Sequence, residues 1–459
     1  MNNEIMRKIP KIDEVLQEQC LFEYIKELPK ALVLDSIREE IANLRNEISK
    51  ADDSYVLDYD KLLANILSKI QKKKQLSIRK VINATGTVIH TNLGRSKLSY
   101  EASKAALNSA TSYSNLEYDL SKGSRGLRHS HVEYILKKLT GMEAAMVVNN
   151  NAAATMLTLS AMGYGKEMIV SRGELVEIGG SFRIPDIMKQ SGCSLKEIGT
   201  TNKTKLSDYE LAIDDEKTAA LMKVHTSNYK IVGFTEDVSL DELVKLGEEK
   251  SIPVIYDMGS GLLIDLSKYG LSEPTVLDAV NSGIDLALFS GDKLLGGPQC
   301  GIIIGKAIFI DKLKKHPLAR ALRIDKMTLA SLEVTLRTYL DEDKAKDEIP
   351  TLKMITSKPE TIKTKAEKLE QELNLIDGVS AEVVETKDQI GGGSAPTTYL
   401  DGYGVSIVHN KLTPEKIERK LRSFRIPIIA RINKDKLIFV LRTVDDDEIE
   451  VIKDAIKEL

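Results

Sequence analysis

The segment from Leu286 to Gly305, which reads LALFSGDKLLGGPQCGIIIG, constrains the fold more than any other part of this sequence. Two short apolar runs flank a glycine-rich loop that carries a single lysine, Lys293. Apolar runs of this length, bounded by glycine and proline, are typical of strands in a sheet that is covered on both faces. The segment therefore predicts a buried α/β sheet with Lys293 at the end of one strand.

A lysine in this setting has a specific chemistry. Among small residues and shielded from water, its amine loses the proton more readily and can form a Schiff base with pyridoxal phosphate. Ser290 and the glycines that follow Lys293 leave room for a flat ring and its phosphate. On this segment alone, a strand-loop-strand unit whose lysine faces water is the alternative.

Two other segments fit the same cofactor. The apolar run in PVIYDMGSG ends in Asp257, and an acid at such a strand end can pair with the protonated pyridine nitrogen of the cofactor. Asn150, Asn151 and Ala152 follow the apolar run AAMVV and begin a helical pattern. Their amides are predicted to hold the cofactor phosphate at the helix N-terminus.

Six segments resemble the bacterial selenocysteine synthase family, the L-seryl-tRNA(Sec) selenium transferases: INATGTVIHTNLGRS, KGSRGLRHSH, SRGELVEIGGSFRIPDIM, YDMGSG, SGDKLLGGPQCG and HPLARALRIDK. Together they cover about residues 82–326. The resemblance implies an aminotransferase-type (fold type I) α/β large domain that binds pyridoxal phosphate, with a small α+β C-terminal domain and an N-terminal helical domain. It also implies that seryl-tRNA(Sec) is converted to selenocysteinyl-tRNA(Sec) with selenophosphate, through an aminoacrylyl-tRNA intermediate, by a homodecamer built from dimers.

The resemblance also assigns roles to particular residues. Asp292, directly before Lys293, is expected to assist the elimination, and either of the two residues can protonate the leaving hydroxyl. Arginine forks match phosphate oxygens. Four arginines in the resembling segments are therefore expected to hold selenophosphate: Arg95, Arg128, Arg320 and Arg323. For any one of them, a surface ion pair is the alternative.

Composition limits the other possibilities. A chain of 459 residues is too long for one core, and 42% hydrophobic with 29% charged residues describes an ordinary globular protein. We found neither an apolar run of membrane-spanning length nor a signal peptide, which predicts a cytoplasmic protein without a membrane partner. The net charge of −3 gives no overall sign of nucleic-acid binding, so a tRNA site must be local. Cys20, Cys193 and Cys300 are predicted to be reduced thiols, with small-residue packing favoured over catalysis for Cys300.

We predict three domains. Residues 1–71 form an N-terminal helical tRNA-binding domain, followed by a basic cluster that extends from Lys69 to Lys80. Residues 72–340 form a linker and the cofactor-binding large domain, and residues 341–459 form the small domain, with a turn at Gly391–Gly393. Seven strands are expected in the large domain: Ala144–Val148, Glu167–Ser171, Ser194–Ile198, Ala219–His225, Pro253–Tyr256, Leu286–Phe289 and Gly301–Ile304.

Some assignments stay open on the sequence alone. His225, at the end of a predicted strand, is placed beside the cofactor, with a structural histidine as the alternative. His129 and His131 have no third metal ligand at a familiar spacing, so no metal is expected. A lyase or transferase with the same cofactor but a free amino acid or amino sugar acid as substrate would use Arg431 or Arg442 for the carboxylate. A tRNA-binding protein without catalysis is a third possibility, although Asp257 and Lys293 together argue against it.

Overall fold

The computed structural model describes residues 2–51, 55–180, 182–391 and 393–459. They form two compact units, Met1–Lys80 and Val81–Leu459. Gly392, in the middle of the predicted glycine turn, lies outside the described residues. In the part of the chain that is described, no helix combines the length and apolar character needed to cross a membrane.

The N-terminal unit is helical. Its helices are α1 (Asn2–Arg7), α2 (Ile12–Val15), α3 (Phe22–Glu27), α4 (Lys30–Lys50) and α5 (Tyr59–Lys74). Helices α4 and α5 carry apolar side chains at helical spacing, and these side chains pack in one core, where Ile37 and Ile66 are fully buried. The basic cluster is partly neutralised within the unit, because Lys69 pairs with Glu40 at 2.9 Å and Lys73 with Glu39 at 2.7 Å.

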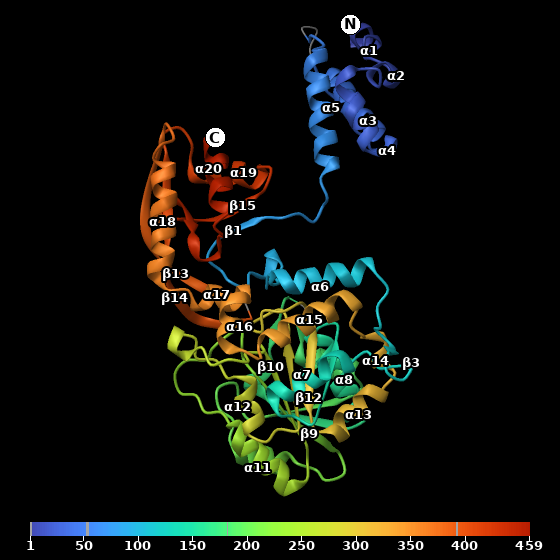
Figure 1. Ribbon diagram of the computed structural model, residues 1–459, viewed down its shortest axis with the longest axis vertical. Helices are drawn as coiled ribbons and strands as arrows, with labels where there is room; N and C mark the ends of the chain where they lie inside the picture. The colour runs from blue at the N-terminus through green and yellow to red at the C-terminus, as the bar shows by residue number, and fades with distance from the viewer. Residues whose placement is uncertain (1, 52–54, 181, 392) are drawn as a thin grey trace. The chain divides into compact units, whose positions relative to one another are not determined.

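The second unit is built around a seven-stranded sheet in which all seven predicted strands are found (Figure 1). In spatial order they are β4 (Ala144–Val148), β12 (Gly301–Gly305), β11 (Leu286–Ser290), β10 (Val254–Gly259), β9 (Thr218–Val224), β5 (Glu167–Ser171) and β8 (Ser194–Ile198). Strand β12 is antiparallel to both neighbours, and the other strands run parallel to one another. Strand β10 continues to Gly259, three residues beyond the predicted end, because Asp257 and Gly259 still pair with β11 across a bulge.

Alternate residues of these strands enter two separate cores, as a sheet covered on both faces requires. Ala145 and Val147 of β4 belong to one core, and Met146 and Val148 belong to the other. Helices α7 (Ser130–Thr140), α10 (Leu206–Ala212), α11 (Leu240–Lys250), α12 (Val276–Asn281) and α15 (Lys326–Thr338) bury side chains in the first core. Helices α8 (Asn151–Gly163), α9 (Ile184–Gln190), α13 (Ala307–Lys315) and α14 (Leu318–Ala321) cover the second. Helix α6 (Tyr100–Thr111) packs against α15 (Figure 1).

Two short hairpins complete the large sheet's surroundings. Strands β2 (Tyr118–Asp119) and β3 (Ser124–Arg125) form one hairpin, and β6 (Glu177–Ile178) and β7 (Phe182–Arg183) form the other. The second hairpin matters for function, since Gly179 and Phe182 line the cavity described below.

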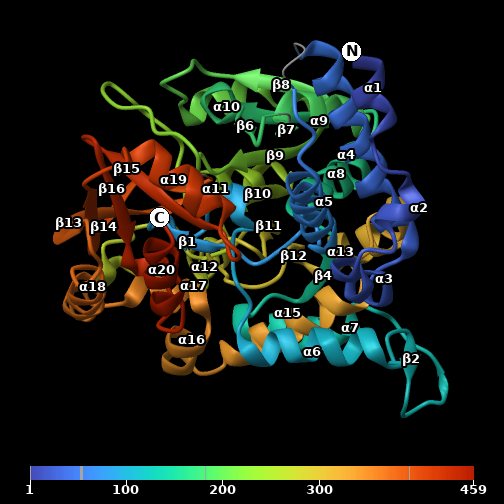
Figure 2. The same cartoon turned by 90° about the horizontal axis from the view of Figure 1, so that it is seen from above.

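The C-terminal sheet has five strands: β1 (Ile82–Ala84), β15 (Ile428–Asn433), β16 (Lys436–Val440), β14 (Ser394–His409) and β13 (Val379–Gly391). Helices α18 (Pro359–Leu373), α19 (Pro414–Ser423) and α20 (Glu448–Lys457) bury side chains in the core of this sheet, and Figure 2 shows them beside it. Helices α16 (Glu342–Glu348) and α17 (Pro350–Thr356) instead bury side chains in the first core of the large sheet. Strand β1 pairs in parallel with β15, with Ile82 opposite Ile428. Residues 82–84 thus belong to the C-terminal sheet, whereas the sequence-based boundaries assign them to the large domain.

Candidate active site

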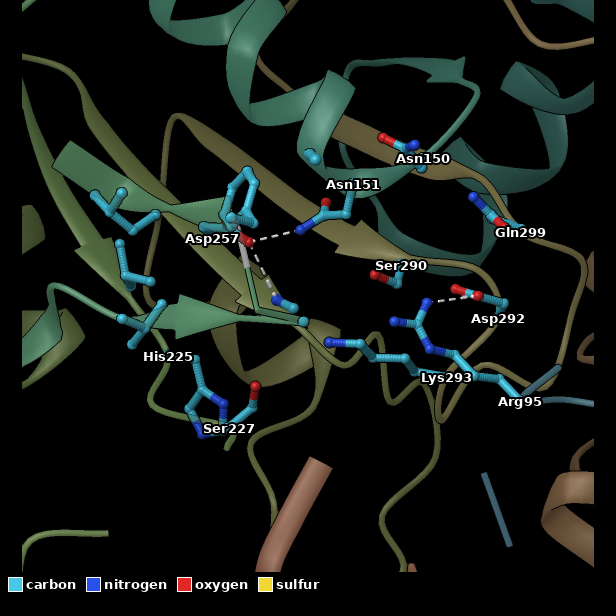
Figure 3. A pocket seen from close by; sticks show the side chains of 17 residues that line it. Arg95, Asn150, Asn151, His225, Ser227, Asp257, Ser290, Asp292, Lys293 and Gln299 are labelled. Atoms are coloured by element: carbon cyan, nitrogen blue, oxygen red, sulfur yellow. Dashed lines mark hydrogen bonds and ion pairs between the residues drawn. The ribbon is translucent and has the colours of Figure 1, made fainter. Parts of the chain in front are cut away.

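A cavity of about 230 Å³ opens where the parallel strands of the large sheet end (Figure 3). Its walls come from the C-terminal ends of β9, β10 and β11, from the start of α8 and from the β6–β7 hairpin. At the C-terminal ends of parallel strands, backbone and side-chain polar groups are no longer paired within the sheet. Ligands therefore commonly bind at this edge. Lys293, Asp257, Asn150, Asn151, Ala152, Ser290, His225, Asp292 and Arg95 all line this cavity.

Asp257 is buried and held in one orientation. Asn151 Nδ2 donates to its carboxylate at 2.8 Å, Thr155 Oγ1 donates at 2.9 Å, and the Gly259 amide donates at 3.2 Å. Burial nevertheless raises the pKa of Asp257, because desolvation outweighs these donors and the nearby Lys293. A cationic ring nitrogen in the cavity would satisfy this carboxylate as an ion-pair partner.

Lys293 is also buried, with its side chain extending into the cavity (Figure 3). Burial lowers the pKa of its amine, and Arg95 lowers it further. Lys293 Nζ donates to the carbonyl of Gly393, at the tip of the β13–β14 hairpin, at 3.2 Å. Gly259 lies beside this amine with a φ of +67°, a left-handed backbone conformation that favours glycine.

The backbone of Lys293 is fixed by a residue that the sequence analysis did not identify. Ser96 Oγ donates to the carbonyl oxygens of Asp292 and Lys293 at 2.8 and 2.9 Å. Its neighbour Arg95 has a left-handed φ of 59° and forms an ion pair with Asp292 at 2.8 Å. The same loop therefore positions the lysine and brings a guanidinium to the cavity.

The other three predicted arginines do not line this cavity. Arg128 pairs with Glu117 at 2.9 Å, and Arg323 lies 3.7 Å from the same carboxylate. The backbone of Leu322 accepts a hydrogen bond from the Asn149 amide at 3.0 Å, which places α14 and its C-terminal end beside the start of α8. Arg320 lies on α14. These arginines thus lie near the end of β4, outside the cavity wall.

The start of α8 has the form expected of a phosphate site. The Asn150 side chain caps the helix by accepting from the Ala153 amide at 2.8 Å, and the Ala154 amide makes the first bond to the Asn150 carbonyl at 3.1 Å. The amides of Asn151 and Ala152 precede that bond and are available to an anion. The Asn151 side chain itself donates to Asp257, which leaves its backbone amide for the predicted phosphate role.

Three observations show that pyridoxal phosphate fits these residues. Asp257 is a buried acid beside the cavity, and the helix N-terminus supplies amides for a phosphate. Ser227 Oγ and His225 Nδ1 are buried on the cavity wall without a hydrogen-bond partner in the described structure. Buried polar atoms of this kind are usually satisfied, which a bound polar ring would do.

Thr155 escaped the sequence analysis, although a signal was present. It lies four residues after Asn151 on α8, so both side chains project from one face of the helix and reach the same carboxylate.

Cys300 is fully buried and its pKa is raised by desolvation, which agrees with a packing role. His129 accepts from the Val147 amide at 3.4 Å and His131 contacts the Leu116 carbonyl at 3.1 Å, so both rings serve the structure.

We predict that Asp257→Asn retains the cofactor but slows catalysis by about 10²- to 10³-fold, because a neutral amide cannot stabilise a ring cation. Single-turnover kinetics with saturating cofactor would measure this. The raised pKa of Asp257 also has a consequence without cofactor. A carboxyl group whose pKa is higher in the folded than in the unfolded protein destabilises the fold as pH rises above the unfolded pKa, so the Tm of the wild type should fall over that range. The Tm of Asp257→Asn should fall less, because its side chain does not ionise. Wild-type turnover by Asp257→Asn would contradict the assignment.

Comparison with known proteins points to one family. Residues 81–445 match the family model described as L-seryl-tRNA selenium transferase, and residues 6–45 match one described as selenocysteine synthase N terminal. The chain is 50% identical over 459 residues to the L-seryl-tRNA(Sec) selenium transferase of Clostridium botulinum (strain Loch Maree / Type A3), with 99% of each chain covered. It is 48% identical over 466 residues to that of Alkaliphilus oremlandii (strain OhILAs), again over 99% of each chain.

A solved structure shares the fold. The structure of D-glucosaminate-6-phosphate ammonia-lyase aligns with a TM-score of 0.58 at 22% identity, covering 84% of this chain and 97% of that one. At this identity the likeness shows the fold alone.

Proposed function

This chain belongs to the L-seryl-tRNA selenium transferase family, and from that premise we propose how its residues carry out the reaction. The protein is a pyridoxal-phosphate-dependent transferase that converts seryl-tRNA(Sec) to selenocysteinyl-tRNA(Sec). We further propose that selenophosphate is the selenium donor and that the reaction takes place in the cytoplasm. The observation that carries the site assignment is that Asp257 and Lys293 are both buried and line one cavity.

Four residues would hold the cofactor. Lys293 would bind it covalently, Asp257 would face its ring nitrogen, and the amides of Asn151 and Ala152 would bind its phosphate. Ser290 and His225 would line the ring. When bound, the ring withdraws the electrons that are released at the substrate Cα.

Lys293 is the proposed acid and base. Its lowered pKa increases the share of neutral amine, which can remove the Cα proton of the seryl group. The same amine then returns a proton to the hydroxyl that leaves Cβ, since hydroxide itself is a poor leaving group. Asp292 is committed to Arg95 in the described structure, so we assign it the role of orienting that guanidinium.

Arginine side chains are proposed to bind the selenium donor. Arg95 lies in the cavity wall, next to the reacting lysine, and its fork can exchange Asp292 for a phosphate. Arg128, Arg320 and Arg323 lie near the end of β4 and would extend the same basic surface.

We expect Arg320→Ala and Arg323→Ala to raise the KM for selenophosphate by about 10- to 100-fold, because each removes one charge-assisted contact. The visible absorbance of the bound cofactor should stay unchanged. Arg337→Ala is a matched control, since Arg337 is exposed and pairs with Glu333 within α15. Loss of bound cofactor with normal donor kinetics in the first two variants would refute the donor role.

The alternative with a free amino acid as substrate is less well supported. Arg442, one candidate for binding a free carboxylate, is buried in an ion pair with Asp388 at 2.7 Å and also donates to the carbonyls of Met354 and Asp401. Removing it from Asp388 would leave a buried charge unpaired, at a cost of about 3–5 kcal/mol. Neither Arg442 nor Arg431 is among the described residues that line the cavity.

We also propose that the protein assembles as a homodecamer built from dimers. Exposed apolar side chains on the described surface support assembly, including Val232 and Phe234 in the loop after β9 and Leu211 on α10. Light scattering on the full-length protein tests this proposal, and a monodisperse monomer at micromolar concentration would reject it.

One experiment tests the central proposal. Purified protein should show the visible band of enzyme-bound pyridoxal phosphate and should convert seryl-tRNA(Sec) in the presence of selenophosphate. Conversion of free serine at a similar rate, with no dependence on tRNA, would instead favour the free amino acid alternative.

A further inference from the structure

His225 and Glu273 lie next to each other behind the cavity wall. His225 Nε2 is 3.5 Å from Glu273 Oε2, and both side chains are largely buried. Glu273 Oε2 has no hydrogen-bond partner within the described chain, and neither has His225 Nδ1. Glu273 belongs to the segment between Leu271 and α12, so the pair joins two elements that are distant in sequence.

The imidazole is tied to the catalytic strands by its backbone. The His225 amide donates to the Asp257 carbonyl at 2.9 Å, and the Ser227 amide donates to the His225 carbonyl at 2.9 Å. In Figure 3 the His225 ring and Ser227 lie together on the side of the cavity that faces the end of Lys293. The structure thus places His225 between a buried carboxyl group and the space for the cofactor ring.

We propose that Glu273 is a positioning residue that closes its 3.5 Å separation from His225 Nε2 to a hydrogen bond when the cofactor is bound, and thereby sets which tautomer His225 presents to the cofactor through Nδ1. This inference rests on the proposed function. When Glu273 is protonated it donates to Nε2, and Nδ1 then carries the hydrogen and would donate to the ionised hydroxyl oxygen on the cofactor ring. When Glu273 is ionised it accepts from Nε2, and Nδ1 becomes an acceptor that no longer binds an anionic oxygen.

Local electrostatics support this exchange. Burial raises the pKa of Glu273 to about 7, opposed by Lys230, so its proton is gained or lost near neutral pH. Burial lowers the pKa of His225 to about 4, and Lys223 and Lys293 lower it in the same direction. Glu273 also lies near enough to Tyr256 to contribute, after burial, to the raised pKa of that phenol. Both shifts favour a neutral pair over an ion pair, which makes the proton on Glu273 the variable that selects the tautomer.

The test uses full-length protein loaded with pyridoxal phosphate. We expect the visible band of the wild type to change with a midpoint at or above about pH 7 as Glu273 ionises. In Glu273→Gln the amide can donate to Nε2 at every pH, so the band should be retained between pH 6 and 9 without that transition. Glu273→Ala should weaken cofactor binding by about tenfold, through loss of one hydrogen bond.

Asp237→Asn is the matched control. Asp237 is 85% exposed and lies 3.8 Å from Lys223, so its replacement removes a carboxylate near Lys223 and leaves Glu273 and His225 unchanged. This variant should keep the wild-type midpoint. Identical midpoints in wild type and Glu273→Gln would overturn the inference, whatever the alanine variant does. A wild type without a visible band would overturn the proposed function, and this inference with it.

Discussion

Lys293→Ala should abolish covalent attachment of pyridoxal phosphate and reduce turnover by at least about 10²- to 10⁴-fold, the range for loss of a positioned acid–base group. Lys293 is buried beside the cavity, and the pKa of its amine is lowered. Among the described residues that line the cavity there is no second lysine that could replace it. Absorbance spectroscopy and borohydride reduction followed by peptide mass spectrometry measure the attachment.

Lys306→Ala is the control for this change. Lys306 also follows a strand of the large sheet, but its side chain is 45% exposed and pairs with Asp285 at 2.7 Å. This variant should keep the visible band and the activity. A borohydride-trapped cofactor in Lys293→Ala, at wild-type yield, would show that another residue carries it.

The large sheet was predictable because its strands can be recognised from short stretches of sequence. Strands β4, β11 and β12 are short runs of apolar and small residues, and burial on both faces leaves no polar alternation within them. The positions of Asp257 and Lys293 follow from the same strands, because Asp257 directly follows the apolar residues of β10 and Lys293 lies three residues after β11 ends at Ser290. Short-range pattern was sufficient for the strands and for both residues.

Partners brought together by the tertiary fold were not predictable in this way. Strand β1 joins β15 across about 345 residues of sequence, and its three residues carry no signal for that choice. Ser96 reaches the carbonyl of Lys293 from a loop almost 200 residues away, and Glu273 meets His225 through a segment without a motif. The ion-pair partners of the predicted arginines could not be predicted for the same reason, since the fold pairs Arg95 with Asp292 and Arg128 with Glu117.

The helical N-terminal unit raises a separate question, which is how one tRNA is selected. The cavity receives only the seryl end of its substrate, and every serine tRNA has that end. We therefore propose that Met1–Lys80 recognises the tRNA body, which is supported by the family match at residues 6–45. The ion pairs of Lys69 and Lys73 with Glu40 and Glu39 reduce the charge available for phosphate. Recognition of the folded shape of the RNA suits such a balanced surface better than charge alone.

Deleting residues 1–80 should leave a folded protein with the visible cofactor band, because Val81–Leu459 forms its own compact unit with the large-sheet and small-sheet cores. Its preference for tRNA(Sec) over tRNA(Ser) should fall by about 100-fold or more, equivalent to about 2.8 kcal/mol of differential binding. Binding assays with both charged tRNAs measure the preference, and the cofactor band and Tm serve as controls for folding. If the truncated protein keeps full selectivity but loses its oligomeric state, the N-terminal unit serves assembly, and the surface that distinguishes the two tRNAs lies within Val81–Leu459.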